Sequence, residues 1–148
     1  MAFIAHVKNN LYFDVSSDRL AIQRLKRDAR IRGHYLDRIH HDDELRQCWE
    51  SIITELERKP LHNSSHDPDT PEIDRWWNSA EDQPKREDDR PSGIVHSFED
   101  WENMVEYWCS VRNNLFHGGK SPHNGRDAFL VEHSFITLRA LVETELAS

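Results

Sequence analysis

The sequence predicts an all-α fold, a bundle of four long helices plus a short one that pairs into a dimer. Four segments place apolar residues at intervals of three and four, the spacing of one helix face. The chain has 148 residues, about the length of a single domain, and five Trp residues supply core volume. At 36% hydrophobic and 31% charged residues, so small a domain commonly buries its remaining apolar surface against a second copy.

The first two long helices are predicted over residues 17–40 and 42–58. Ser16 or Ser17 caps the first, whose apolar positions are Leu25, Ala29, Leu36 and Ile39. The second follows two acidic residues, which favour a helix start, and ends before a Lys-Pro pair. Its apolar positions are Leu45, Trp49, Ile52, Ile53 and Leu56.

The middle of the chain looks irregular, because five of the six Pro residues lie between residues 60 and 96. We expect a short helix over residues 71–80, which begins at Pro71, and a charged loop at 81–96. At the other end, weak alternation over residues 1–15 indicates an extended arm or a short strand. The whole chain, 1–148, is interpreted as one domain.

The last two long helices are predicted over residues 98–117 and 125–146. Ser97 caps the former, with Asp100 three residues on. Its continuous apolar stripe is Trp101, Met104, Val105, Trp108, Val111 and Leu115. The apolar set of the terminal helix is Phe129, Leu130, Ile136, Ala140, Leu141 and Leu146.

Charge and cysteine content narrow the class of protein. The net charge is −8, and residues 67–106 alone carry 13 acidic and 4 basic side chains, a net of −9. Such acidity argues against broad, sequence-blind binding of phosphates. No apolar run is long enough to span a membrane, and the N-terminus lacks the pattern of a signal peptide. We expect Cys48 and Cys109 to be buried thiols of a cytoplasmic protein.

The stretch VRNNLFHGGK, residues 111–120, contains the candidate catalytic residues. The glycine pair 118–119 predicts a helix end, so that His117 is the last helical residue or the cap. His can take or give a proton near neutral pH, and Arg112 offers a fork for a phosphate. Asn113 or Asn114 would orient the histidine or hold a phosphate oxygen. The alternative is an arginine in a surface ion pair beside an ordinary helix cap.

Further along, Lys120, His123 and Arg126 form a candidate cluster for steering RNA phosphates, against the alternative of ordinary surface charge. The many basic residues of 17–40 are open to the same two interpretations. We expect no metal site: His62 and His66 lie in a loop without a third ligand at a recognised spacing. No cofactor motif is present, so no cofactor is predicted.

The run from Arg112 to His117 resembles the Arg-x(4–6)-His signature of the HEPN superfamily, in its Arg-Asn-x(3)-His form. The resemblance covers residues 97–146, and residues 17–58 only as two preceding helices. It implies a helical bundle that dimerises so that two motifs face each other in one composite site. Some HEPN toxins have a Tyr two residues after the His, where partner enzymes adenylylate them; Gly119 stands there in this chain.

The resemblance further implies a metal-independent endoribonuclease, the effector of a toxin–antitoxin, abortive-infection or CRISPR-linked defence system. Arg112 and His117 would be catalytic, and Asn113 would assist. The partners would be RNA, a second copy and a regulatory protein such as an antitoxin. The alternative is a catalytically inactive HEPN-type module that binds a nucleotide or a protein. Such cleavage needs one proton taken from the 2′-hydroxyl and one given to the departing 5′-oxygen. One His cannot readily make both transfers, which is a further reason to expect a dimer.

Overall fold

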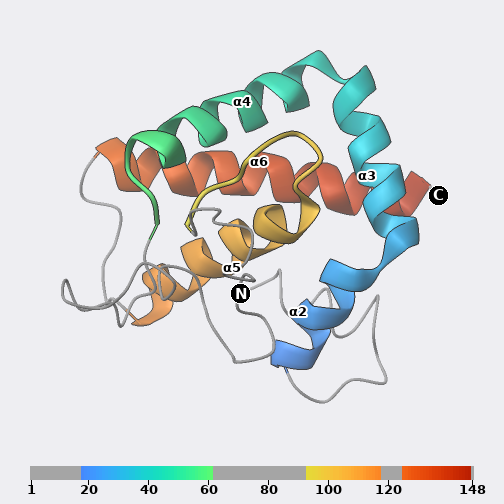
Figure 1. Ribbon diagram of the computed structural model, residues 1–148, viewed down its shortest axis with the longest axis horizontal. Coiled ribbons are helices and arrows are strands. Elements are labelled where there is room, and N and C mark those ends of the chain that lie inside the picture. The colour runs from blue at the N-terminus through green and yellow to red at the C-terminus, as the bar shows by residue number, and fades with distance from the viewer. Residues whose placement is uncertain (1–17, 62–92, 118–124, 148) are drawn as a thin grey trace.

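A computed structural model of the protein describes residues 18–61, 93–117 and 125–147. These residues form five helices and no strand, so the predicted all-α class is confirmed (Figure 1). The helices are α2 (Asp18–Arg27), α3 (Ala29–His41), α4 (Asp43–Arg58), α5 (Trp101–His117) and α6 (Gly125–Ala147). The predicted arm at 1–15 and short helix at 71–80 lie outside the described residues, as does most of the charged loop.

The single helix predicted over 17–40 is wrong, because the chain breaks at Asp28 into α2 and α3. Asp28 is extended, with φ −79° and ψ 98°, and its carboxylate accepts a hydrogen bond from the Ile31 amide at 3.0 Å. That is the geometry of a helix N-cap. The break resets the helical register, so Ala29 is exposed, whereas Ile31 and Tyr35 are buried.

The bounds of the later helices agree with the prediction more closely. Asp42 caps α4 by accepting from the Leu45 amide, and α4 ends at Arg58. The cap predicted at Ser97 is displaced, because α5 begins only at Trp101. The carbonyl of Asp100 accepts the first helical hydrogen bond, from Met104, while the Asp100 carboxylate accepts from the backbone amide of His96 at 2.9 Å.

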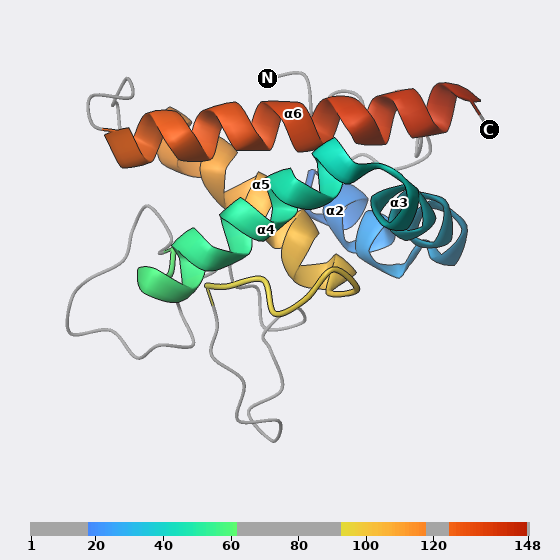
Figure 2. The same ribbon diagram turned by 90° about the horizontal axis from the view of Figure 1, so that it is seen from above.

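The helices are arranged around α5 and α6. The long α6 packs against α3, α4 and α5, and α2 packs against α5. In Figure 2, α6 runs along one edge of the molecule, with α2, α3 and α4 all on the same side of it. Every side chain from Met104 to Val111 is buried, so α5 is enclosed around its circumference over two turns. The sequence predicted one apolar stripe on this helix, and the structure buries its other faces as well.

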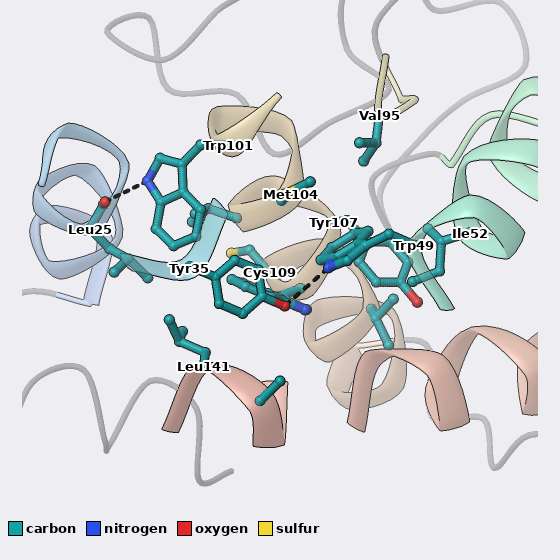
Figure 3. Packing of buried hydrophobic residues seen from close by; sticks show 14 of the residues in the cluster. Leu25, Tyr35, Trp49, Ile52, Val95, Trp101, Met104, Tyr107, Cys109 and Leu141 are labelled. Carbon is teal, nitrogen blue, oxygen red and sulfur yellow. Dashed lines mark hydrogen bonds between the residues drawn. The ribbon is translucent and has the colours of Figure 1, made fainter. Parts of the chain in front are cut away.

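Five aromatic side chains form the centre of the core (Figure 3). Their ring centroids lie 5.6–5.9 Å apart in tilted or edge-to-face pairs, the separations that aromatic rings favour. The five are Tyr35, Trp49, Trp101, Tyr107 and Trp108. They come from α3, α4 and α5, so this cluster joins α5 to two helices that precede it by more than 40 residues.

The polar atoms of these buried aromatics all have hydrogen-bond partners. Trp49 donates to the Tyr35 hydroxyl at 3.0 Å, which donates to the Thr137 carbonyl at 2.9 Å. Trp108 donates to the Thr137 hydroxyl at 2.8 Å. The two other donors bond to backbone carbonyls, Trp101 to that of Leu25 and Tyr107 to that of Leu130. Each ring is therefore held in one orientation.

The two ends of the segment 62–92 lie side by side. The Leu61 amide donates to the Gly93 carbonyl at 3.0 Å. Gly93 has φ 83°, in the left-handed region that favours glycine. Leu61 and the following Ile94 and Val95 are buried, which fixes both ends of the segment to the core. Most of the acidic middle of the chain thus joins the helical domain at one place.

The terminal helix α6 differs from its prediction in which residues it buries. Leu130, Ala140 and Leu141 are buried as expected, together with Ser134 and Thr137. Leu146, predicted to face the core, is 80% exposed. The reason is that α6 carries apolar residues on two opposite faces, and only one faces the bundle. No helix in the described part of the chain has the length and apolar character that crossing a membrane requires.

Candidate functional site

The Arg–Asn–His motif lies on the last two turns of α5, the most enclosed helix of the described bundle. The helix ends at His117, which confirms that this residue is the last helical position. The side chains of Arg112, Asn113, Asn114 and His117 lie outside the described residues, as do Lys120 and His123 entirely. The candidate site is therefore defined by the backbone of α5 and by the described side chains that precede it.

The helical backbone places the motif residues on two faces. Residues four apart lie about 40° apart around a helix, so positions 113 and 117 share a face. Positions 112 and 117 are about 140° apart. Asn113 is thus better placed by the backbone than Arg112 to act next to His117. An arginine acting on the same phosphate as His117 must reach around the helix end or come from another copy of the chain.

A buried ion pair occupies the same face of α5 further toward the N-terminus. The ammonium group of Lys26, on α2, contacts the carboxylate of Glu106, and only 9% and 4% of these side chains are exposed. Positions 106, 110, 113 and 117 follow the 4-3-4 spacing of a single helix face. The Ser110 hydroxyl is buried and has no hydrogen-bond partner within the described residues. A polar stripe therefore runs along the enclosed part of α5 toward His117.

The sequence prediction missed Glu106 and Ser110 as members of this stripe. The signal was present, because both residues interrupt a run of apolar residues at helical spacing from Asn113 and His117. Breaking a buried ion pair by removing one partner typically costs about 3–5 kcal/mol. Lys26 and Glu106 thus fix how α2 sits on α5, and through it the orientation of the helix that ends in the motif.

Arg126, predicted to bind RNA, is engaged within the protein. Its guanidinium contacts the Glu55 carboxylate and donates to the Lys59 carbonyl at 2.6 Å. The guanidinium of Arg58 holds the pKa of Glu55 below its usual range, with a further contribution from Arg126. These contacts fasten the start of α6 to the end of α4. An RNA phosphate at Arg126 would have to compete with Glu55 for the same guanidinium.

The basic residues of α2 and α3 are likewise partly used in internal contacts. Besides the pair of Lys26, Arg30 lies 3.6 Å from Glu145 of α6. Arg38 donates to the Ala140 carbonyl at 3.0 Å and pairs with Glu143 at 3.3 Å. Several cations of this segment thus hold helices together, which favours the structural interpretation over a continuous RNA-binding face.

The histidines that the structure describes do not assemble a metal centre. No group of three or more His, Cys, Asp or Glu side chains gathers within the described ranges. His133 stacks on Phe129 with ring centroids 3.8 Å apart, and its Nδ1 lies 2.8 Å from the Phe129 carbonyl oxygen. It is a packed histidine. His62 and His66 lie outside the described residues.

Comparison with known proteins adds no relative to this description. No protein-family model, no curated protein and no solved structure matches the chain. The likeness to the HEPN superfamily therefore rests on the residues of the motif and on the helix that carries them.

Proposed function

We propose that the protein is a metal-independent endoribonuclease that works as a homodimer, with Arg112 and His117 in a composite HEPN-type site. The observation that supports this most is the motif's position: α5 ends at His117, on the helix that the core encloses most completely. A catalytic group on such a helix is held by a rigid support, which proton transfer requires. The biological role we propose is that of a toxin or defence effector.

In the proposed reaction, the 2′-oxygen of a ribose attacks the adjacent phosphorus while the bond from phosphorus to the 5′-oxygen breaks. One His117 imidazole takes the proton from the 2′-hydroxyl. The protonated imidazole of the second copy gives a proton to the departing 5′-oxygen. Arg112 stabilises the negative charge that builds up on the phosphoryl oxygens. The products are a 2′,3′-cyclic phosphate and a 5′-hydroxyl.

Asn113 supports this chemistry by sharing the helix face of His117, where an amide can orient the imidazole. Asn114 would contact the RNA backbone, and so would Lys120 and His123. Arg126 would take part only by exchanging Glu55 for a phosphate, and otherwise fastens α6. The two histidines and two arginines complete each other only if the helix ends of two copies meet.

Cleavage of RNA in the presence of EDTA tests the proposal. We expect the purified protein to cut RNA, with fragments whose masses correspond to 2′,3′-cyclic phosphate ends. Replacing His117 by Ala should slow cleavage about 100-fold or more, the usual contribution of a general acid or base. Arg112→Ala should have an effect of similar size. Exposed residues of α3 supply matched controls, His41→Ala and Arg32→Ala, which should cut at the wild-type rate.

Two results would contradict the proposal. If the wild-type protein cuts no RNA, the nuclease function is wrong. If it cuts only with added divalent metal, the acid–base mechanism is wrong although the activity is right.

The second candidate is a catalytically inactive module that binds a nucleotide or a protein. The concentration of charge favours it, because a segment with a net of −9 suits a basic protein partner better than RNA. Under this function, wild type and His117→Ala would both leave RNA intact, and replacing residues 62–92, which hold most of these acidic residues, would abolish capture of the partner.

A further inference from the structure

The outward face of α6 carries an apolar stripe whose inner edge, Val131 and Leu138, packs against the core and whose other residues extend beyond it. Six positions share this face, at intervals of three or four residues: Ala128, Val131, Phe135, Leu138, Val142 and Leu146. We call them the outer seam. Their intervals are those of a helix that packs along another helix. The opposite face of α6 holds its buried residues, so the seam points away from the core.

The outer seam holds large hydrophobic side chains that are exposed to solvent. Phe135 is 65% exposed and Leu146 is 80% exposed, and they are the exposed large hydrophobics of the described residues. Both lie on the same face of one helix. Val131 and Leu138 are half-buried where they pack against the core, Val142 is half-buried too, and part of each of these side chains stays exposed beside Phe135 and Leu146. An exposed apolar stripe along one helix face is a candidate for a surface that another protein covers.

Two opposite charges lie along one side of the outer seam. Glu132 and Arg139 are exposed and seven residues apart, two turns along the same side of the helix. Neither forms an ion pair within the part of the chain that the structure describes, and Arg139 lies 6.0 Å from the centre of the Phe135 ring. These two charges fit a second copy of the same surface, because the positive group of one copy can meet the negative group of the other.

Symmetry decides how two such helices must run. In an antiparallel pair about a twofold axis, the same sides of the two helices face each other, so Glu132 of each copy comes level with Arg139 of the other. In a parallel pair about a twofold axis, the charged sides lie on opposite flanks of the contact, and these charges do not meet. Charge therefore favours the antiparallel arrangement.

The register that pairs these charges also suits the sizes of the side chains along the outer seam. When Glu132 is level with Arg139, the two Phe135 side chains lie next to the twofold axis. Leu146, the most exposed large hydrophobic residue, comes level with Gly125, where a further carbon atom would meet nothing within 4 Å. An exposed large side chain thus faces a position with free space, and the central aromatic residue faces its own counterpart.

We infer that a second copy of this chain packs on the outer seam, with the two α6 helices antiparallel and the Phe135 rings at the centre. This contact is distinct from the one that the composite site needs. The first residues of the two α6 helices would lie about 30 Å apart, from the rise of 1.5 Å per residue. Because α5 ends on the side of the molecule where α6 begins (Figure 1), the two motifs would lie at opposite ends of the pair.

The mass of the protein in solution tests the contact. We expect wild type to be at least dimeric at micromolar concentration in sedimentation equilibrium, and Phe135→Glu to raise the dissociation constant of the seam contact at least 100-fold. Phe135→Leu keeps an apolar side chain and should change it less than tenfold. Arg32→Glu introduces the same acidic group on an exposed part of α3 and is the matched charge control. A monomeric wild type would overturn the inference, and so would an unchanged Phe135→Glu.

Charge exchange tests the register. Glu132→Arg and Arg139→Glu should each weaken association about tenfold, and the variant with both changes should recover it. A double variant that associates no better than the singles would refute the antiparallel register.

A disulfide cross-link is a second test of the register. In Phe135→Cys, two cysteines would meet at the axis and form an intermolecular disulfide on oxidation. The native Cys48 and Cys109 are buried and should not interfere. Failure of position 135 to cross-link would equally refute the antiparallel register.

RNA cleavage separates this inference from the proposed function. If the seam contact passes these tests and wild type cuts no RNA, the contact stands and the nuclease proposal fails. If wild type cuts RNA while Phe135→Glu leaves its mass unchanged, the nuclease proposal stands and the seam contact fails. Mass and cleavage are therefore measured on the same preparations.

Discussion

Thr137 is the residue on which the aromatic core converges. Its hydroxyl accepts from Trp108 and its carbonyl accepts from Tyr35. Replacing Thr137 by Val keeps the shape and leaves the Trp108 indole without its acceptor in the core. A buried unsatisfied donor costs about 1–3 kcal/mol. We expect urea unfolding to show that loss of stability. Thr54→Val, on the exposed side of α4, should change stability by less than about 0.5 kcal/mol. Equal stabilities of the two variants would contradict this account.

Cys48 should be unreactive in the native protein. Burial, with the nearby Glu132 carboxylate, raises the pKa of its thiol to about 11. Because the thiolate is the reactive form, the thiol stays protonated at pH 8 and alkylation is slow. We expect iodoacetamide to label neither Cys48 nor the buried Cys109 rapidly in the folded protein, and both in urea. Fast labelling of Cys48 in the absence of urea would show that α4 opens locally.

At the scale of elements, the sequence predicted the bounds of a helix best where several signals agree. The bounds of α4 and α6 were predicted within a residue or two because charge, proline and periodicity agree there. The break at Asp28 was missed because a single Asp fits the polar face of a long helix as well as it fits a cap. Leu146 was placed in the core because periodicity shows that a face is apolar, and does not show which face meets the bundle.

The candidate site was predicted unevenly for related reasons. The helix end at His117 follows from local chemistry, since a glycine pair favours the end of a helix. The partners of Lys26 and Arg126 depend on which helices lie together, and no local pattern specifies them. The sequence therefore could not identify Glu106 as the partner of Lys26, or Glu55 as the partner of Arg126. Both assignments require knowing that α2 packs on α5 and that α4 packs on α6.

The segment 62–92 is expected to be dispensable for folding. Its two ends are joined by the hydrogen bond from Leu61 to Gly93, so a short glycine-rich linker can replace it. Closing a shorter loop should add about 1–2 kcal/mol of stability through loop-closure entropy. Circular dichroism should show that the shortened chain is still mainly helical, with a melting temperature no lower than that of wild type. Gly93→Val, which strains the left-handed residue, should lower the melting temperature instead. A shortened chain that does not fold would show that the segment completes the core.

At the scale of the whole molecule, the two inferred self-contacts use different surfaces of the fold. The composite nuclease site needs the end of α5, whereas the outer seam uses the length of α6. A protein that used both would assemble beyond a dimer, because each contact would leave the other surface free on the outside of the pair. Such an assembly would bring sites together only above a threshold concentration, which would suit an effector that must stay silent at low abundance.

The aromatic core has a consequence for synthesis of the chain. Tyr35, near the start of the described bundle, is bonded to the Thr137 carbonyl, and Trp108 is bonded to the hydroxyl of the same residue. A nascent chain emerging from the ribosome has α2, α3 and α4 available long before α6. Contacts so far apart in sequence close late. The aromatic core therefore cannot form completely until α6 has been translated. A chain released from a ribosome that stalls before α6 would not be folded.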